Sequence, residues 1–166
     1  MCGLAGLIDW GAGFGKEKLA AITLDMRDSM IHRGPDDAGI WSNDSGSCAL
    51  AHRRLSIIDL SADGKQPMCN EDGTIWVTFN GEIYNFQQLR AQLIAEGHYF
   101  HSQTDTEVLP HLFEKMEPER LKSLDGMFAF AAWNERDKRL LLARDPFGKK
   151  PLYFSEGPGW FALLLN

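Results

Sequence analysis

Apolar positions along the chain follow two spacings, one typical of helices and one typical of strands. Apolar residues three or four positions apart form one stripe in residues 17–30 and another in residues 86–96, which predicts two amphipathic helices. A third helix is expected from Thr104 to about Met116, because Thr104-Asp105-Thr106-Glu107 has the form of a capping box. Short apolar, aromatic and β-branched runs predict strands at residues 2–9, 39–41, 47–51, 74–79, 127–133, 140–144, 152–154 and 160–165.

The order of these elements indicates the fold class. Long helices lie among many short strands that are joined by turn residues, such as Asn43-Asp44-Ser45-Gly46. This favours an α+β fold with antiparallel sheets over a parallel βαβ array. The 166 residues are enough for one domain, which we place at residues 1–166. Because the chain ends directly after the apolar run 161–165, we expect that it is cut from a longer protein.

Composition excludes several classes of partner. The chain is 44% hydrophobic and 24% charged, as a globular domain should be. Its net charge of −6, without a run of Lys or Arg, argues against nucleic acid and anionic membranes. No signal peptide and no apolar stretch of roughly 20 residues is present, so no membrane association is expected.

The cysteines and histidines predict neither disulfides nor a metal site. The chain has three cysteines, Cys2, Cys48 and Cys69, which are far apart in the sequence. An odd number of distant cysteines indicates reduced thiols in a cytoplasmic protein. His98 and His101 are three residues apart, but no cysteine or second histidine pair lies near them in the sequence. We therefore expect no zinc site.

The second residue carries the first candidate chemistry. If Met1 is removed, Cys2 becomes the N-terminus and holds a nucleophilic thiol and a free α-amine. That amine has an ordinary pKa of about 8 and can act as a base for the thiol. The alternative is structural, since cysteine is also a small hydrophobic residue that suits a first strand.

A cysteine that attacks an amide also needs donors for the oxyanion. Asn80-Gly81-Glu82 follows the strand expected at residues 74–79. Asn80 offers a side-chain N–H, and Gly81 offers a backbone N–H that a ligand can approach closely. Asn-Gly is equally a common hairpin turn, although the residues that follow it predict a helix rather than a returning strand.

Charged residues inside apolar segments could hold the two ends of an amino acid. Either Arg53 or Arg54 could bind a carboxylate, but only one of two neighbours on a strand faces a given side. Asp105 could bind an ammonium group, or it could be an acid favoured by the helix dipole. Thiol, oxyanion donors, one cation and one anion together describe a pocket for glutamine or asparagine.

These residues occur within segments that resemble a known family. The chain is similar to the N-terminal glutaminase domain of glutamine-hydrolysing asparagine synthetases, which are class II glutamine amidotransferases. The segments that carry the resemblance are Met1-Cys2-Gly3 to Gly6, Arg33-Gly34-Pro35-Asp36, Arg53 to Asp59, Gln66-Pro67-Met68, Asn80-Gly81-Glu82-Ile83-Tyr84-Asn85, Thr104 to Glu107, Leu124 to Phe130 and Arg144-Asp145-Pro146-Phe147-Gly148.

The resemblance implies a fold and a reaction. The fold is a four-layer αββα N-terminal nucleophile hydrolase sandwich, with two antiparallel sheets between helices. In the reaction, Cys2 attacks the side-chain amide of L-glutamine, ammonia leaves, and water hydrolyses the glutamyl thioester to L-glutamate.

The resemblance also assigns roles to individual residues. Cys2 is the nucleophile, with its own amine as base, and Asn80 and Gly81 form the oxyanion hole. Arg54 binds the α-carboxylate of glutamine, whereas Asp105 and Glu82 contact the region of its α-amine. The remaining glutamine-binding residues are Leu55, Ser56, Ile57 and Ile58.

The family likeness extends beyond what this chain contains. In the family a synthetase domain follows and uses ATP and magnesium to convert aspartate to asparagine. Those cofactors and that partner domain are expected only in a parent protein, and this chain should need no cofactor. A homodimer is compatible with the family. Two alternatives remain, namely an amidotransferase that supplies another ammonia acceptor and a non-catalytic regulatory domain.

Overall fold

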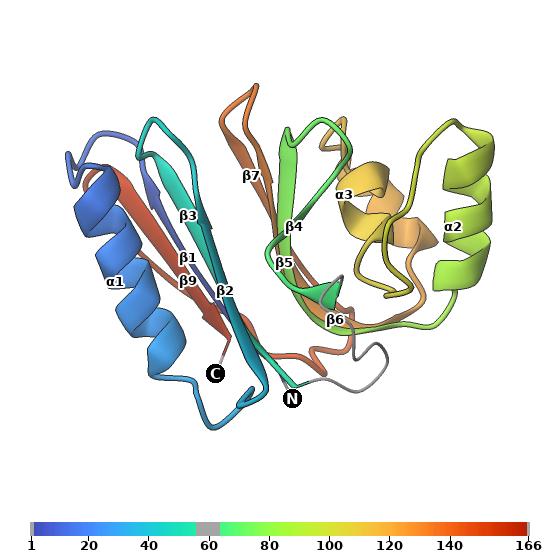
Figure 1. Ribbon diagram of the computed structural model, residues 1–166, viewed down its shortest axis with the longest axis horizontal. Coiled ribbons are helices and arrows are strands. Elements are labelled where there is room, and N and C mark those ends of the chain that lie inside the picture. Colours follow the sequence, from blue (N-terminus) through green and yellow to red (C-terminus); the bar gives the residue numbers. More distant parts are fainter. Residues whose placement is uncertain (1, 56–63, 166) are drawn as a thin grey trace.

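The computed structural model describes residues 2–55 and 64–165, and in these residues it confirms the predicted αββα sandwich (Figure 1). One helix covers the outer face of the first sheet, and two further helices cover the outer face of the second. The elements are β1 (Gly3–Asp9), α1 (Lys16–Asp28), β2 (Asp37–Ser42), β3 (Cys48–Arg54), β4 (Met68–Cys69), β5 (Ile75–Ile83), α2 (Phe86–Ala95), α3 (Val108–Leu112), a 3₁₀ helix (Pro118–Ser123), β6 (Gly126–Asn134), β7 (Arg139–Arg144), β8 (Tyr153–Gly157) and β9 (Trp160–Leu165).

Both sheets are antiparallel, as the short strands and turns predict. The first has the order β2-β3-β1-β9-β8, and the second has the order β4-β5-β6-β7. In the first sheet, β1 is central and pairs Gly3 with Arg53 of β3. This register brings the start of the chain next to the end of β3.

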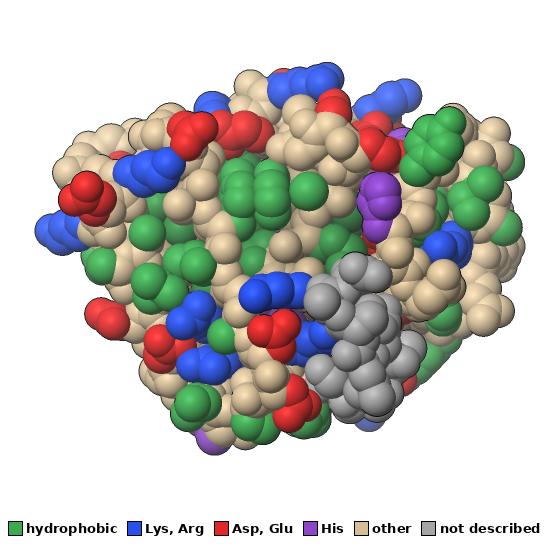
Figure 2. Space-filling view, viewed as in Figure 1, with side chains coloured by type: hydrophobic (Ala, Val, Ile, Leu, Met, Phe, Trp, Pro, Cys, Tyr) green, Lys and Arg blue, Asp and Glu red, His purple; other side chains and the backbone are tan. Residues whose placement is uncertain are grey.

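Strand alternation separates the core into layers. In β6, Phe128, Phe130 and Ala132 pack on the side of α2 and α3, whereas Ala129 and Trp133 pack between the sheets. Successive side chains on a strand point to opposite faces, so one strand serves two cores. Figure 2 shows that hydrophobic side chains also reach the surface along the seam between the sheets.

Polar contacts join the two sheets near the start of the chain. The Thr78 hydroxyl of β5 donates to the Ala51 carbonyl of β3 at 3.1 Å. His52 Nε2 lies 3.0 Å from the Phe79 carbonyl, and burial lowers the pKa of His52 to about 4. The imidazole is therefore neutral at physiological pH, and Nε2–H is the tautomer that can donate to this carbonyl. These bonds hold β3 against β5.

Gly97 ends α2 as the sequence predicts. It adopts a φ of 104°, which disfavours residues with a side chain. The N–H of His98 donates to the Leu93 carbonyl, and the N–H of Gly97 donates to the Ile94 carbonyl. This pair of bonds is a Schellman motif.

The predicted capping box at Thr104–Glu107 is wrong. The helix α3 begins only at Val108 and has 5 residues. The Glu107 carboxylate instead accepts the backbone N–H groups of His101 at 2.6 Å and Ser102 at 2.7 Å. The Glu107 carboxylate therefore accepts hydrogen bonds from the upstream loop and not from Thr104, and Thr104 to Thr106 remain outside the helix.

The predicted end of the strand at Phe79 is also wrong. β5 continues to Ile83, and Asn80 and Gly81 pair with Ala129 and Phe128 of β6. A side chain at position 81 would lie 2.2 Å from the Met127 carbonyl oxygen. Asn-Gly therefore forms neither a hairpin turn nor a loop here, because glycine allows the close approach of β6.

Candidate active site

One pocket opens where β1, β3 and β5 converge, and it contains the described residues to which the family resemblance assigned roles. Cys2 stands directly before β1, and Arg54 and Leu55 stand at the end of β3. The loop before α3 closes a further side of the pocket. The lining residues are Cys2, Arg54, Leu55, Gly64, Gln66, Phe79, Asn80, Gly81, Glu82, Thr104, Asp105, Thr106 and Lys150.

The Cys2 thiol is half-buried and faces a backbone donor. The N–H of Leu55 points to Cys2 Sγ at 3.4 Å. Arg33 Nε donates to the Cys2 carbonyl at 3.3 Å and fixes the backbone of this residue. These two contacts hold the Cys2 thiol at the wall of the pocket.

The edge of β5 presents Gly81 to the pocket. The N–H of Phe79 donates to Gln66 Oε1 at 2.7 Å, and the N–H of Ile83 donates to Asp105 Oδ2 at 2.8 Å. Backbone N–H groups alternate between the two edges of a strand, so the N–H of Gly81 points to the same edge as these two. It lies between two donors whose acceptors are side chains lining the pocket.

Asn80 adds a second donor from the face of the same strand. Its side chain is 4% exposed, and Nδ2 has no hydrogen-bond partner among the described residues. A buried amide N–H without a partner is costly and rare. Asn80 Nδ2 and the Gly81 N–H together could receive the oxygen of a bound amide.

The two neighbouring arginines face opposite ways, as strand alternation requires. Arg53 points to α1 and pairs with Asp28 at 2.5 Å. Arg54 is buried and lines the pocket. A side chain at Gly64 would lie 2.3 Å from the Arg54 guanidinium, so glycine leaves room for it there. Of the two, Arg54 is the one placed to bind a ligand in the pocket.

Asp105 and Glu82 are two acidic residues that line the same pocket. Burial raises the pKa of Asp105, and the nearby Glu82 carboxylate adds to the rise. The Ile83 N–H opposes it and fixes the orientation of the Asp105 side chain. A ligand ammonium group beside Asp105 would offset the cost of burying this charge.

Ser56, Ile57 and Ile58, which the sequence analysis assigned to glutamine binding, lie outside the described residues. The sequence analysis assigned no role to several residues that do line the pocket, among them Gln66, Thr106 and Lys150. Gln66 and Thr106 are within segments that carry the family resemblance, and Lys150 follows one closely. These segments were the available signal, but only the fold shows that their side chains meet.

The other two thiols lie away from the pocket. Cys48 is fully buried between the sheets, and burial raises its pKa well above the ordinary value. Burial also raises the pKa of Cys69, which is in β4. Both thiols are disfavoured as nucleophiles, because the thiolate is the reactive form.

Comparison with known proteins identifies the family. A family model described as a glutamine amidotransferase domain matches residues 1–163. The chain belongs to this family. This glutamine amidotransferase domain is 42% identical over 161 residues to asparagine synthetase [glutamine-hydrolyzing] 1 of Bacillus subtilis. The alignment covers 93% of this chain and 24% of that protein. It is also 42% identical over 165 residues to asparagine synthetase [glutamine-hydrolyzing] 3 of Arabidopsis thaliana, covering 98% of this chain and 27% of that protein.

A known structure of another amidotransferase supports the fold of this glutamine amidotransferase domain. Glutamine phosphoribosylpyrophosphate amidotransferase from B. subtilis superimposes with a TM-score of 0.78 at 25% identity, covering 98% of this chain and 41% of that one. Compared with the two asparagine synthetases, the domain spans about a quarter of their length. None of the helices in residues 2–55 and 64–165 is long and apolar enough to cross a membrane.

Proposed function

We propose that this glutamine amidotransferase domain hydrolyses L-glutamine to L-glutamate and ammonia through a thioester on Cys2. The observation that carries the proposal is the unpartnered Asn80 Nδ2, which lines the same pocket as the Cys2 thiol. Family membership supports glutamine as the substrate, and the pocket offers a group for each part of it. Arg54 receives the α-carboxylate, and Asp105 with Glu82 receives the α-ammonium group.

These positions support the following reaction. Once Met1 is removed, the α-amine of Cys2 takes the thiol proton, and Sγ attacks the side-chain carbonyl carbon of glutamine. Asn80 Nδ2 and the Gly81 N–H stabilise the oxyanion. The C–N bond breaks as the amine returns the proton to the leaving ammonia. Water then attacks the thioester, releases glutamate and restores the thiol.

We propose further that the ammonia serves ATP-dependent conversion of aspartate to asparagine on a synthetase domain of a longer protein. The support is the 42% identity to asparagine synthetases of which this chain spans about a quarter. ATP and magnesium would belong to that domain, and the glutaminase reaction needs neither. A cytoplasmic location fits the three free cysteines.

A second candidate differs only in the ammonia acceptor. The structural likeness to phosphoribosylpyrophosphate amidotransferase shows that this fold also occurs with another acceptor. The identity of 25% is lower than the 42% to asparagine synthetases, so asparagine synthesis is favoured. A non-catalytic regulatory domain is disfavoured, because Cys2, Asn80, Gly81 and Arg54 are all present around one pocket.

The direct test uses a glutamine analogue that alkylates thiols. We expect one adduct per chain, on Cys2 and not on Cys48 or Cys69, and release of glutamate and ammonia from glutamine by the untreated protein. Peptide mapping by mass spectrometry locates the adduct. Labelling of Cys69 instead, or no glutamate release, would contradict the proposal.

Replacing Asn80 by alanine should slow glutamine turnover by about 10²–10³-fold in kcat, the usual cost of losing one oxyanion donor. The KM for glutamine should change much less, because the donor acts on charge that develops in the transition state. Asn85→Ala is the matched control, since Asn85 does not line the pocket. A loss of less than threefold for Asn80→Ala would remove this residue from the oxyanion hole.

Replacing Asp105 by asparagine should weaken glutamine binding and yet stabilise the fold. Truncating one partner of a buried charge pair raises KM by about tenfold or more. The pKa of Asp105 is raised by burial, so the folded protein holds this proton more tightly than the unfolded chain. The negative charge of Asp105 destabilises the folded protein. This loss of stability is absent below the ordinary pKa of 3.8 and increases as the pH rises through the folded-state pKa.

At neutral pH, Asp105→Asn should therefore unfold at a higher urea concentration than the unmodified protein. The difference should shrink as the pH falls toward the ordinary carboxyl value. Urea unfolding followed by circular dichroism at several pH values measures it. A variant that is less stable at neutral pH would show that the Ile83 N–H bond outweighs the cost of burial.

A further inference from the structure

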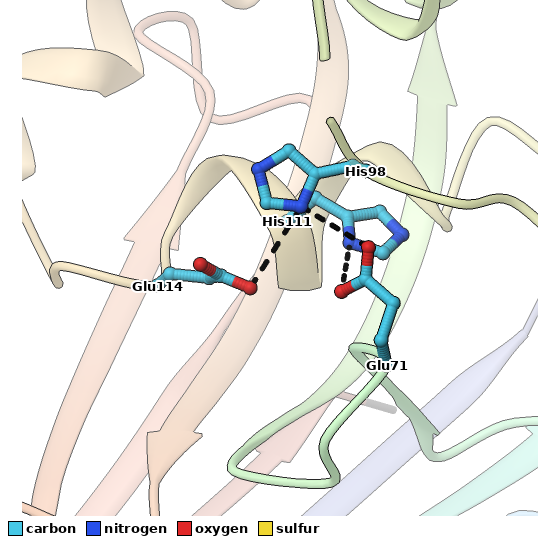
Figure 3. Close-up of side chains that lie close together, drawn as sticks. All are labelled: Glu71, His98, His111 and Glu114. Carbon is cyan, nitrogen blue, oxygen red and sulfur yellow. Dashed lines mark hydrogen bonds and ion pairs between the residues drawn. The ribbon is translucent and has the colours of Figure 1, made fainter. Parts of the chain in front are cut away.

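Two histidines and two glutamates from distant parts of the chain point their donor atoms toward one another (Figure 3). Glu71 is in the turn between β4 and β5, and His98 follows α2. His111 is in α3, and Glu114 follows it. None of the four lines the pocket that contains Cys2.

The distances within this cluster match a small coordination sphere. His98 Nδ1 lies 3.2 Å from Glu71 Oε1 and 3.9 Å from Glu114 Oε1. His111 Nδ1 lies 3.1 Å from Glu71 Oε2. All four donor atoms are within 4.8 Å of one another. Ligands at the usual zinc distances, tetrahedrally arranged, lie about 3.4 Å apart, so the shorter separations already fit and the longest must close by about 1.4 Å.

Neighbouring donors already orient the two carboxylates. The backbone N–H of Tyr99 donates to Glu71 Oε1 at 2.8 Å. Asn70 Nδ2 donates to Glu114 Oε1 at 2.8 Å, and Asn70 Oδ1 shapes the turn by accepting the N–H of Ile75. Metal sites commonly have such outer contacts, which hold the ligands in place before the ion binds.

The cluster is buried on one side and open on the other. His111 is 3% exposed, and its ring packs against Phe100 and His98 at centroid distances of 4.6 Å and 4.9 Å. Its Nε2 has no partner among the described residues, and its Nδ1 faces Glu71. Glu71 is exposed, which leaves an ion a path from solvent.

We propose that Glu71, His98, His111 and Glu114 bind one Zn²⁺ ion. Two imidazole nitrogens and two carboxylate oxygens suit zinc, whereas Mg²⁺ and Ca²⁺ prefer oxygen ligands alone. The ion would join the turn before β5, the loop after α2 and α3. It would thereby brace the loop 98–107, whose end at Thr104 to Thr106 lines the pocket. His101, which the sequence analysis paired with His98, is not part of the cluster.

The proposal is tested by titrating chelator-treated protein with zinc sulfate in a calorimeter. We expect one equivalent of Zn²⁺ to bind, Mg²⁺ not to compete, and zinc to raise the midpoint of thermal unfolding. His98→Ala and Glu114→Gln should each weaken zinc affinity at least about tenfold, a loss in the range known for perturbed metal sites. These two residues are chosen because His111 is buried and its replacement could prevent folding.

Two controls separate this site from other zinc ligands. His101→Ala removes an exposed histidine of the same loop and should bind zinc with unchanged affinity. Cys2→Ala removes the pocket thiol and should also leave zinc affinity unchanged. Circular dichroism confirms that each variant is folded. Absence of saturable binding, or binding that Cys2→Ala abolishes and His98→Ala does not change, would overturn the proposal.

Discussion

Replacing Cys2 by alanine should abolish glutamine hydrolysis, with a loss in kcat of about 10⁴-fold or more, as for other catalytic nucleophiles. The reason is that no other described thiol reaches the pocket, and the thioester cannot form without one. Glutamine should still bind, because Arg54 and Asp105 remain in place. Steady-state release of glutamate and equilibrium binding of glutamine measure the two effects separately.

The matched control is Cys69→Ala, which removes a half-buried thiol outside the pocket and should keep nearly full turnover. The intact mass of the active protein should also show that Met1 has been removed. If most molecules retained Met1 and still turned over glutamine, the α-amine could not be the base. If Cys2→Ala kept more than a few per cent of activity, the thioester mechanism would be wrong.

Replacing Arg54 by alanine should raise the KM for glutamine by about 30-fold or more. A buried, hydrogen-bonded charge pair that loses one partner costs 2–5 kcal/mol or more, and about 1.4 kcal/mol corresponds to a tenfold change. Arg54→Lys should give an intermediate KM, because lysine keeps the charge but lacks the planar fork that binds a carboxylate through two bonds. Initial rates over a wide range of glutamine concentration provide the KM values.

Arg53→Ala is the paired control on the neighbouring residue. Arg53 interacts with Asp28, whose side chain is 49% exposed, and such pairs contribute roughly 0–1 kcal/mol to stability. The KM for glutamine should therefore stay within about threefold of the unmodified value. If Arg53→Ala raised KM and Arg54→Ala did not, the assignment of the carboxylate ligand would be reversed.

Much of the local structure could be predicted from the pattern of residues. Both long helices and eight of the strands occur near their expected positions, because apolar spacing reflects which side of an element is buried. The two-residue strand β4 was not predicted, since so short a segment has no periodicity. The helix α3 is shorter than predicted because Glu107 accepts backbone N–H groups from the loop just before it. The strand β5 is longer than predicted because Gly81 pairs with Phe128 of β6, which is far away in the sequence.

The candidate site was likewise predicted only in part from the sequence. Cys2, Asn80 and Asp105 were candidates from their chemistry and from the family resemblance. Which arginine faces them was left open by the residues themselves and follows in the structure from the register of β3. The unpartnered amide of Asn80 and the open edge of β5 at Gly81 are visible only in the folded chain.

The sequence alone determined the fold class and the segments that carry the family likeness, because periodicity and local motifs are written in consecutive residues. Tertiary structure alone decided which side chains meet. It placed Arg54 in the pocket and Arg53 outside it, and it brought Glu71 to His98, His111 and Glu114. These contacts depend on strand register and layer packing, which bring together residues that are far apart in the sequence.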